Sequence, residues 1–137
     1  MANEALVKSV KDIAAASKAG DAEGAYRGYH RLFDSEAFAS YRVEDQRQVL
    51  RLMILAKGLP AKPTPVMSEA YTSAVSCLTR IVPLGDAADY ELLGVCQVML
   101  GDEGSASETF RAGLAIERAR DPQSKLCGTL MKRVSMV

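Results

Sequence analysis

The sequence predicts an all-α fold, and three observations carry that prediction. Apolar residues recur every three to four positions along most of the chain, as on one face of a helix, and no segment keeps the alternation of a strand. Glycine, aspartate and proline interrupt this pattern at intervals that suit helix lengths. The chain of 137 residues is 48% apolar, 6% aromatic and free of tryptophan, which favours helices packed through small side chains. We expect one domain, residues 1–137, of about seven helices in antiparallel pairs.

The first helix pair is predicted over residues 5–36. Its first helix has an apolar stripe made of Leu6, Val7, Val10, Ile13 and Ala14. Gly20 supplies a helix C-cap and Asp21 an N-cap, so the chain turns sharply there. The second helix presents an apolar face made of Ala25, Tyr29, Leu32 and Phe33. The segment at residues 34–41 is expected to break or bend the chain.

The second pair is predicted over residues 43–83, with a proline-rich loop between its helices. The first helix begins near Val43, where two acidic residues favour the positive end of a helix dipole, and runs to Gly58. Three basic residues line one side of this helix and are expected to form a solvated face: Arg42, Arg47 and Arg51. The loop at residues 58–65 ends in Thr64-Pro65, which is typical of a helix start. The role of this loop stays open.

The third pair is predicted over residues 87–120. Its two helices are separated by Gly101-Asp102, the same C-cap and N-cap residues as in the first pair. Its acidic residues lie at helix starts and are interpreted as caps rather than as metal ligands. Asp121-Pro122 then predicts the start of a last amphipathic helix, residues 122–136. The apolar side of that helix includes Leu126, Leu130 and Val134.

Residues 87–120 resemble a tetratricopeptide repeat (TPR), a unit of two helices and about 34 residues with a recurrent pattern of small and large residues. The matching positions are Tyr90, Leu93, Gly94, Gly101, Asp102, Ala106 and Phe110. The first pair repeats part of this set at Gly20, Asp21, Ala25 and Tyr29. It has Asp12-Ile13 where Leu-Gly is usual, and Gln97 replaces an aromatic residue in the third pair. The middle pair matches by position more than by residue type.

The resemblance implies a short right-handed TPR-like superhelix of three stacked pairs. The helix at residues 122–136 is then interpreted as a capping helix, with a detachable arm that docks on another protein as the alternative. In the family, the first helix of each pair lines a concave groove. The positions carried over to that groove are Glu91, Val95, Val98 and Met99 in the third pair, and Gln48, Leu52 and Leu55 in the second. Packing of these residues inside the chain is as compatible with the sequence as an open groove.

The implied function is that of a non-enzymatic protein–protein interaction module or adaptor, which binds a peptide segment or another protein in an apolar groove. The groove positions lack the Lys, Asn and Arg set that grips the C-terminal carboxylate of chaperone tails, so that mode of binding is not expected. Two alternatives stay open. One is a self-associating scaffold, a homodimer formed through an end of the array or the C-terminal helix. The other is a small secretion-type chaperone.

Composition argues against several other functions. Lys plus Arg and Asp plus Glu each total 17, so no net charge attracts nucleic acid or an anionic membrane. Three widely spaced cysteines, Cys77, Cys96 and Cys127, lie among apolar neighbours and indicate buried thiols in a cytoplasmic protein. His30 is the single histidine and has no evident catalytic partner in the sequence. We therefore expect no catalytic residue, no metal site and no cofactor.

Overall fold

The computed structural model describes residues 3–58 and 62–137, and these form eight α-helices and one short 3-10 helix. The α-helices are α1 (Glu4–Lys18), α2 (Ala22–Asp34), α3 (Glu36–Ser40), α4 (Val43–Ile54), α5 (Pro65–Ile81), α6 (Ala87–Met99), α7 (Glu103–Arg120) and α8 (Lys125–Ser135), and the 3-10 helix η1 (Val82–Leu84) follows α5. The all-α prediction is confirmed. Residues 59–61 of the predicted proline loop lie outside the described residues.

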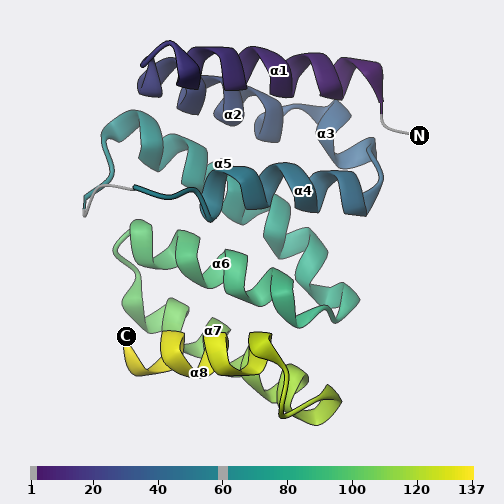
Figure 1. Cartoon of the computed structure of the whole chain (residues 1–137), viewed down its shortest axis with the longest axis vertical. Helices are drawn as coiled ribbons and strands as arrows, with labels where there is room; N and C mark the ends of the chain where they lie inside the picture. Colours follow the sequence, from purple (N-terminus) through teal and green to yellow (C-terminus); the bar gives the residue numbers. More distant parts are fainter. Residues whose placement is uncertain (1–2, 59–61) are drawn as a thin grey trace.

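The helices form two layers that the chain visits alternately (Figure 1). We call the layer that contains α1, α4, α6 and α8 the front layer, and α2, α5 and α7 lie behind it. Sequential helices pack as antiparallel pairs, most extensively α6 against α7. α5 packs against both α2 and α6, so it joins the two halves of the chain. The right-handed superhelix stays a prediction.

The two Gly-Asp turns have the same hydrogen-bond pattern. Gly20 and Gly101 adopt positive φ angles of 82° and 81°, which glycine accepts without strain. In each turn the glycine N–H donates to the carbonyl three residues back, and the aspartate N–H donates to the carbonyl five residues back, which is the Schellman arrangement. The carboxylate then accepts a backbone N–H of the next helix, at 2.9 Å for Asp21 and 3.1 Å for Asp102. The repeated sequence therefore encodes a repeated turn.

Small residues let α6 and α7 approach closely. A Cβ atom at Gly94 would overlap the ring of Phe110, and a Cβ atom at Gly113 would lie 2.6 Å from Cβ of Tyr90. Ala106 and Phe110 are both buried. The predicted positions of the third pair thus have the packing roles that their sizes suggest.

The two helices of the first pair also approach closely, but here the small residue lies on the second helix of the pair and not on the first. Ile13 occupies the position on α1 that corresponds to Gly94 on α6. Gly28 of α2 lies against it, and a Cβ atom at Gly28 would come within 2.7 Å of Cγ1 of Ile13. The large residue that departs from the repeat pattern is therefore accommodated by a glycine on the facing helix.

The segment that was expected only to bend contains a short helix, α3, which raises the number of helices from about seven to eight in the described residues. The Ser35 hydroxyl accepts the N–H of Phe38 at 3.3 Å and caps this helix. The Phe38 side chain is fully buried and packs edge-on against Phe33. This aromatic contact explains why the segment forms a helical turn although it has no periodic pattern.

Two further helix boundaries differ from the prediction. α4 ends at Ile54 rather than near Gly58. α8 begins at Lys125 rather than at residue 122, because the Ser124 hydroxyl caps it by accepting the N–H of Cys127 at 3.0 Å. The Asp121 carboxylate is used in the preceding turn instead.

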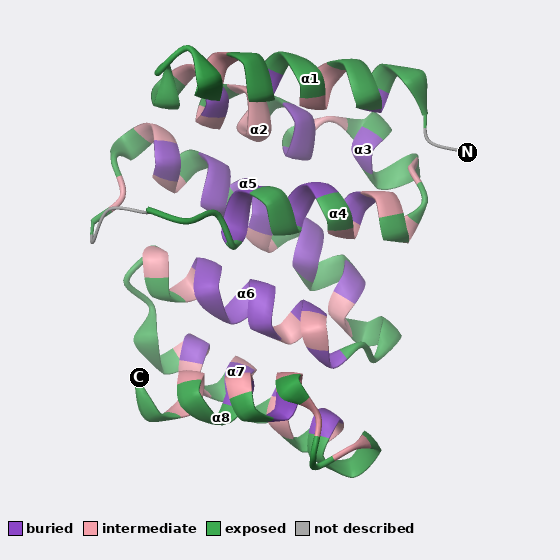
Figure 2. Ribbon diagram, in the orientation of Figure 1, coloured by how far each residue is buried: buried purple, intermediate pink, exposed green. Residues whose placement is uncertain are grey.

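The buried residues form a continuous core that is densest along α5 and α6 (Figure 2). All three cysteines are buried and free. Burial raises the pKa of the Cys77 and Cys96 thiols, so both stay neutral at physiological pH. They pack as small apolar side chains, as the sequence suggests.

Candidate protein-binding surface

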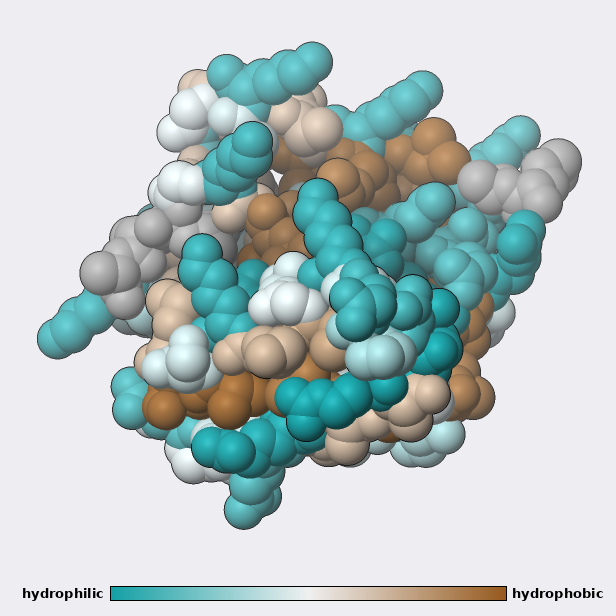
Figure 3. All heavy atoms as spheres, turned by 60° about the horizontal axis from the view of Figure 1, so that its bottom comes forward, coloured by the Kyte–Doolittle hydropathy of each residue, from teal (hydrophilic) through white to brown (hydrophobic). Residues whose placement is uncertain are grey.

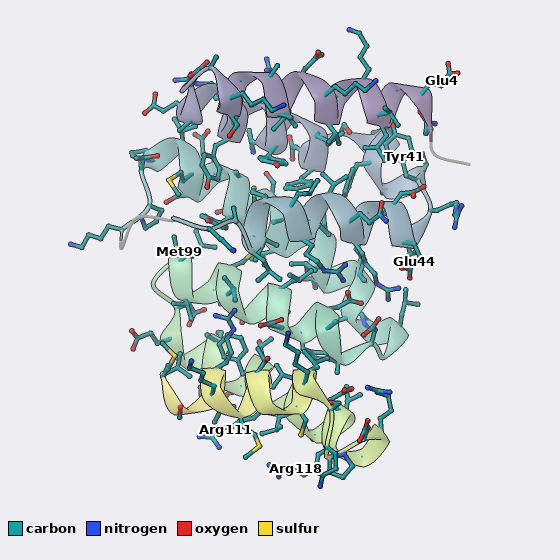
Figure 4. All side chains as sticks on the ribbon, viewed as in Figure 1. Glu4, Tyr41, Glu44, Met99, Arg111 and Arg118 are labelled. Carbon is teal, nitrogen blue, oxygen red and sulfur yellow. The ribbon has the colours of Figure 1, made fainter. Side chains whose placement is uncertain are left out.

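The front layer brings the C-terminal ends of α4 and α6 to one side of the molecule. The two helices contact each other and run in the same direction, from right to left in Figure 1. Figure 4 shows Met99 at the left end of α6 and Glu44 at the opposite, starting end of α4. We call this region the α4/α6 surface, and its residues are Gln48, Arg51, Leu52, Leu55, Val98 and Met99.

Most of the α4/α6 surface is apolar and open to solvent. Leu52 is 55% exposed, Val98 38% and Leu55 37%, and these are high values for large apolar side chains. Met99 is partly buried and packs against the core. A shallow hollow along α4 is lined by Gln48, Arg51, Leu52, Leu55 and Ala56. Figure 3 shows apolar atoms gathered in a recess near the middle of the view, with hydrophilic side chains around it.

Two of the predicted groove residues are not accessible. Glu91 and Val95 are only 8% and 9% exposed. The Glu91 carboxylate accepts a hydrogen bond from Nε of Arg133 on α8, at 2.9 Å. These two side chains therefore pack inside the chain, and the accessible groove positions are those on α4 and at the C-terminal end of α6.

The last helix is anchored at both ends. At its start, the Ser124 hydroxyl that caps α8 donates to Oε2 of Glu117 at 2.6 Å. Glu117 also accepts hydrogen bonds from Arg120, at 2.8 and 2.5 Å. Near its end, Arg133 binds Glu91 of α6. These contacts place α8 as a cap over α7 rather than as a detached arm.

The Glu117 contacts make the stability of the junction between α7 and α8 depend on pH. Hydrogen bonds from Arg120 and Ser124 lower the pKa of Glu117 from 4.5 to about 2. Because the folded-state pKa lies below the unfolded one, the stabilisation is present at neutral pH and is lost as the pH falls through the folded value. We expect the free energy of unfolding to decrease between about pH 5 and pH 2, with a smaller decrease in E117Q. Urea unfolding measured at steps across this range tests the prediction, and equal slopes in the two proteins would contradict it.

A buried ion pair joins α4 to α6. Nε of Arg47 lies 3.0 Å from both carboxylate oxygens of Asp89, and Nη2 lies 2.8 Å from Oδ2. Asp89 is 0% exposed, and Arg47 also binds Glu44. Burial raises the pKa of the Asp89 carboxyl, and the hydrogen bonds from Arg47 oppose that shift. The arrangement fixes the position of α4 against α6 toward the starting ends of the two helices.

The prediction of a solvated basic face on α4 is wrong for Arg47. Its side chain is 11% exposed, and its partner Asp89 had been interpreted as an acidic residue at a helix start. The signal that sequence reasoning missed is the spacing, because Arg47 precedes the buried Leu50 by three residues and the buried Ile54 by seven. That spacing places Arg47 on the buried side of the helix.

His30 also has a partner that the sequence did not reveal. Its Nδ1 lies 2.6 Å from Oγ of Ser73 on α5, and Asp34 and Glu69 line the same shallow hollow. Ser73 lies in the middle of α5, where the backbone N–H groups already serve the helix and provide no oxyanion-binding pair. The contact links α2 to α5, as partly buried polar pairs commonly do between helices.

The part of the chain that the structure describes contains no group of three or more His, Cys, Asp or Glu side chains placed to hold a metal ion. Its helices include none that is long and apolar enough to cross a membrane. Comparisons with family models, curated proteins and solved structures find no match to this chain.

Proposed function

We propose that this protein is a non-enzymatic interaction module that binds a segment of a partner protein on the α4/α6 surface. The observation that carries the proposal is the exposure of three large apolar side chains, Leu52, Leu55 and Val98, near the ends of two contacting helices. Single exposed apolar side chains are ordinary, whereas apolar side chains gathered on one surface are typical of interaction sites.

The arrangement of the helices supports the same proposal. The helix pairs resemble a TPR array, in which the first helix of each pair lines the binding face. Here those first helices are α1, α4 and α6, and all three belong to the front layer (Figure 1). The Schellman turns and close helix crossings of the first and third pairs favour this interpretation.

Substitution of Leu55 and Val98 by glutamate tests the proposed function. In L55E/V98E, two carboxylates replace apolar contact area, so we expect the captured partner to be lost in affinity purification followed by mass spectrometry. Both side chains are exposed, so the helical circular dichroism signal should not change. Retention of every captured protein by L55E/V98E would contradict the proposal.

The matched control is L84E/M131E, which adds the same charge at two exposed apolar positions outside the α4/α6 surface. Leu84 lies in η1, and Met131 is two residues from Arg133, which places it on the other side of α8. This control should keep the partner. Light scattering of the purified protein distinguishes a separate partner from a second copy of the chain, because a homodimer would scatter as twice the monomer mass.

A further inference from the structure

We propose that the segment bound by the α4/α6 surface is an amphipathic helix whose flanking residues are acidic. This inference rests on the proposed function and specifies the chemistry of the partner. Two kinds of observation carry it: the charges that border the surface and the spacing of its accessible side chains.

Three carboxylates of α4 and α6 are paired with arginines inside the chain, and they lie toward the starting ends of the two helices. Glu44 and Asp89 both bind Arg47, and Glu91 binds Arg133. Asp102, in the turn after α6, caps the first turn of α7. These paired carboxylates are therefore separated along α4 and α6 from the exposed apolar side chains near the C-terminal ends of the two helices.

The cations that border the α4/α6 surface are not neutralised in this way. Arg51 belongs to the surface itself, and Lys57 follows Leu55 by two residues. Both are exposed, and neither forms an ion pair with the described residues. An apolar surface bordered by available cations complements a segment with apolar residues on one side and carboxylates beside them.

The spacing of the surface residues suits a short helix. Gln48, Leu52 and Leu55 lie at i, i+4 and i+7 on one side of α4, a span of about 10 Å at 1.5 Å per residue. A partner helix of two to three turns presents apolar side chains at the same spacing over the same distance. A helix-in-groove contact therefore uses the full length of the exposed row.

Synthetic peptides test this inference directly. The probe is a fluorescently labelled 14-residue alanine-based peptide with leucine at positions 4, 8 and 11 and glutamate at four flanking positions. Two matched peptides carry glutamine or lysine in place of glutamate. At low salt we expect the glutamate peptide to bind about tenfold more tightly than the glutamine peptide and the lysine peptide to bind most weakly. The difference should shrink in 0.5 M salt because exposed charges are screened.

Variants of the protein assign the effect to named residues. R51Q/K57Q should remove most of the preference for the glutamate peptide, whereas R111Q/R118Q should not alter it. Figure 4 shows Arg111 and Arg118 at the α7–α8 end of the molecule, away from α4. A glutamate peptide with a central proline should bind at least tenfold more weakly, because proline breaks the helix.

The outcomes separate this inference from the proposed function. Equal binding of the glutamate and glutamine peptides, with both lost in L55E/V98E, would overturn the acidic partner and leave the interaction surface in place. Equal binding of the proline peptide would overturn the helical partner in favour of an extended one. Failure of all the peptides to bind would overturn this inference, and partner capture by wild type but not by L55E/V98E would still support the proposed function.

Discussion

Replacement of Arg47 by methionine is expected to lower the free energy of unfolding by about 3–5 kcal/mol, because the change leaves the buried Asp89 carboxylate without its cation. The guanidinium donates to both oxygens of that carboxylate at 2.8–3.0 Å. Methionine fills a similar volume but cannot donate a hydrogen bond. Urea unfolding at neutral pH measures the loss.

Two further variants make this result specific. In R47M/D89V, apolar side chains replace the whole ion pair, so most of the lost stability should return. In R51M, an exposed arginine of the same helix is removed, and the change should stay within about 0.5 kcal/mol. A loss in R51M as large as that in R47M would contradict the account of the buried pair.

Substitution of Gly94 by alanine is expected to destabilise the protein by about 1–3 kcal/mol through overpacking. The added Cβ atom would overlap the Phe110 ring, which is buried between α6 and α7 and has little room to move. Thermal or urea unfolding measures the change. In F110L the smaller side chain leaves space, so G94A should lower the free energy of unfolding less in the F110L protein than in the wild type.

The control for this experiment is another glycine inside a helix. A Cβ atom at Gly128, in α8, would meet nothing within 4 Å. G128A should therefore stabilise the protein by about 0.5–1 kcal/mol, the usual gain for alanine over glycine in a helix. If G94A stabilised the protein as G128A is expected to, the result would contradict the close crossing of α6 and α7.

The third helix pair could be predicted from the sequence because its determinants are local. The turn at Gly101-Asp102 depends on residues at most five positions apart. Gly94 and Phe110 belong to neighbouring helices joined by that short turn, so the chain has few other ways to place them. The first pair is also joined by a short turn, but there the large residue, Ile13, lies on the first helix and the small one, Gly28, on the second.

Contacts between distant helices could not be predicted in the same way. Arg47–Asp89 and Arg133–Glu91 each join residues 42 positions apart, and His30–Ser73 joins residues 43 apart. Each member has many possible partners in the sequence. The choice depends on how the pairs stack, which no local pattern specifies.

Only part of the candidate surface could be predicted, because contacts between distant helices decide which of its residues are covered. Leu52, Leu55 and Val98 are exposed, as groove positions should be. Glu91 belongs to the same row of α6, but it is covered because Arg133 of α8 reaches it. The position of α8 depends on the Ser124 cap and on Glu117, and the sequence pattern had placed that helix start at residue 122.

The central claim is that the α4/α6 surface binds an acidic amphipathic helix, and its most direct test is a titration followed by two-dimensional ¹H–¹⁵N spectra. The labelled protein is titrated with the unlabelled glutamate peptide. Shift changes are expected at Gln48, Arg51, Leu52 and Leu55 on α4 and at Val98 and Met99 on α6, with the back-layer helices α2 and α5 unchanged. Changes concentrated on α2 and α5, or no change at saturating peptide, would contradict the account.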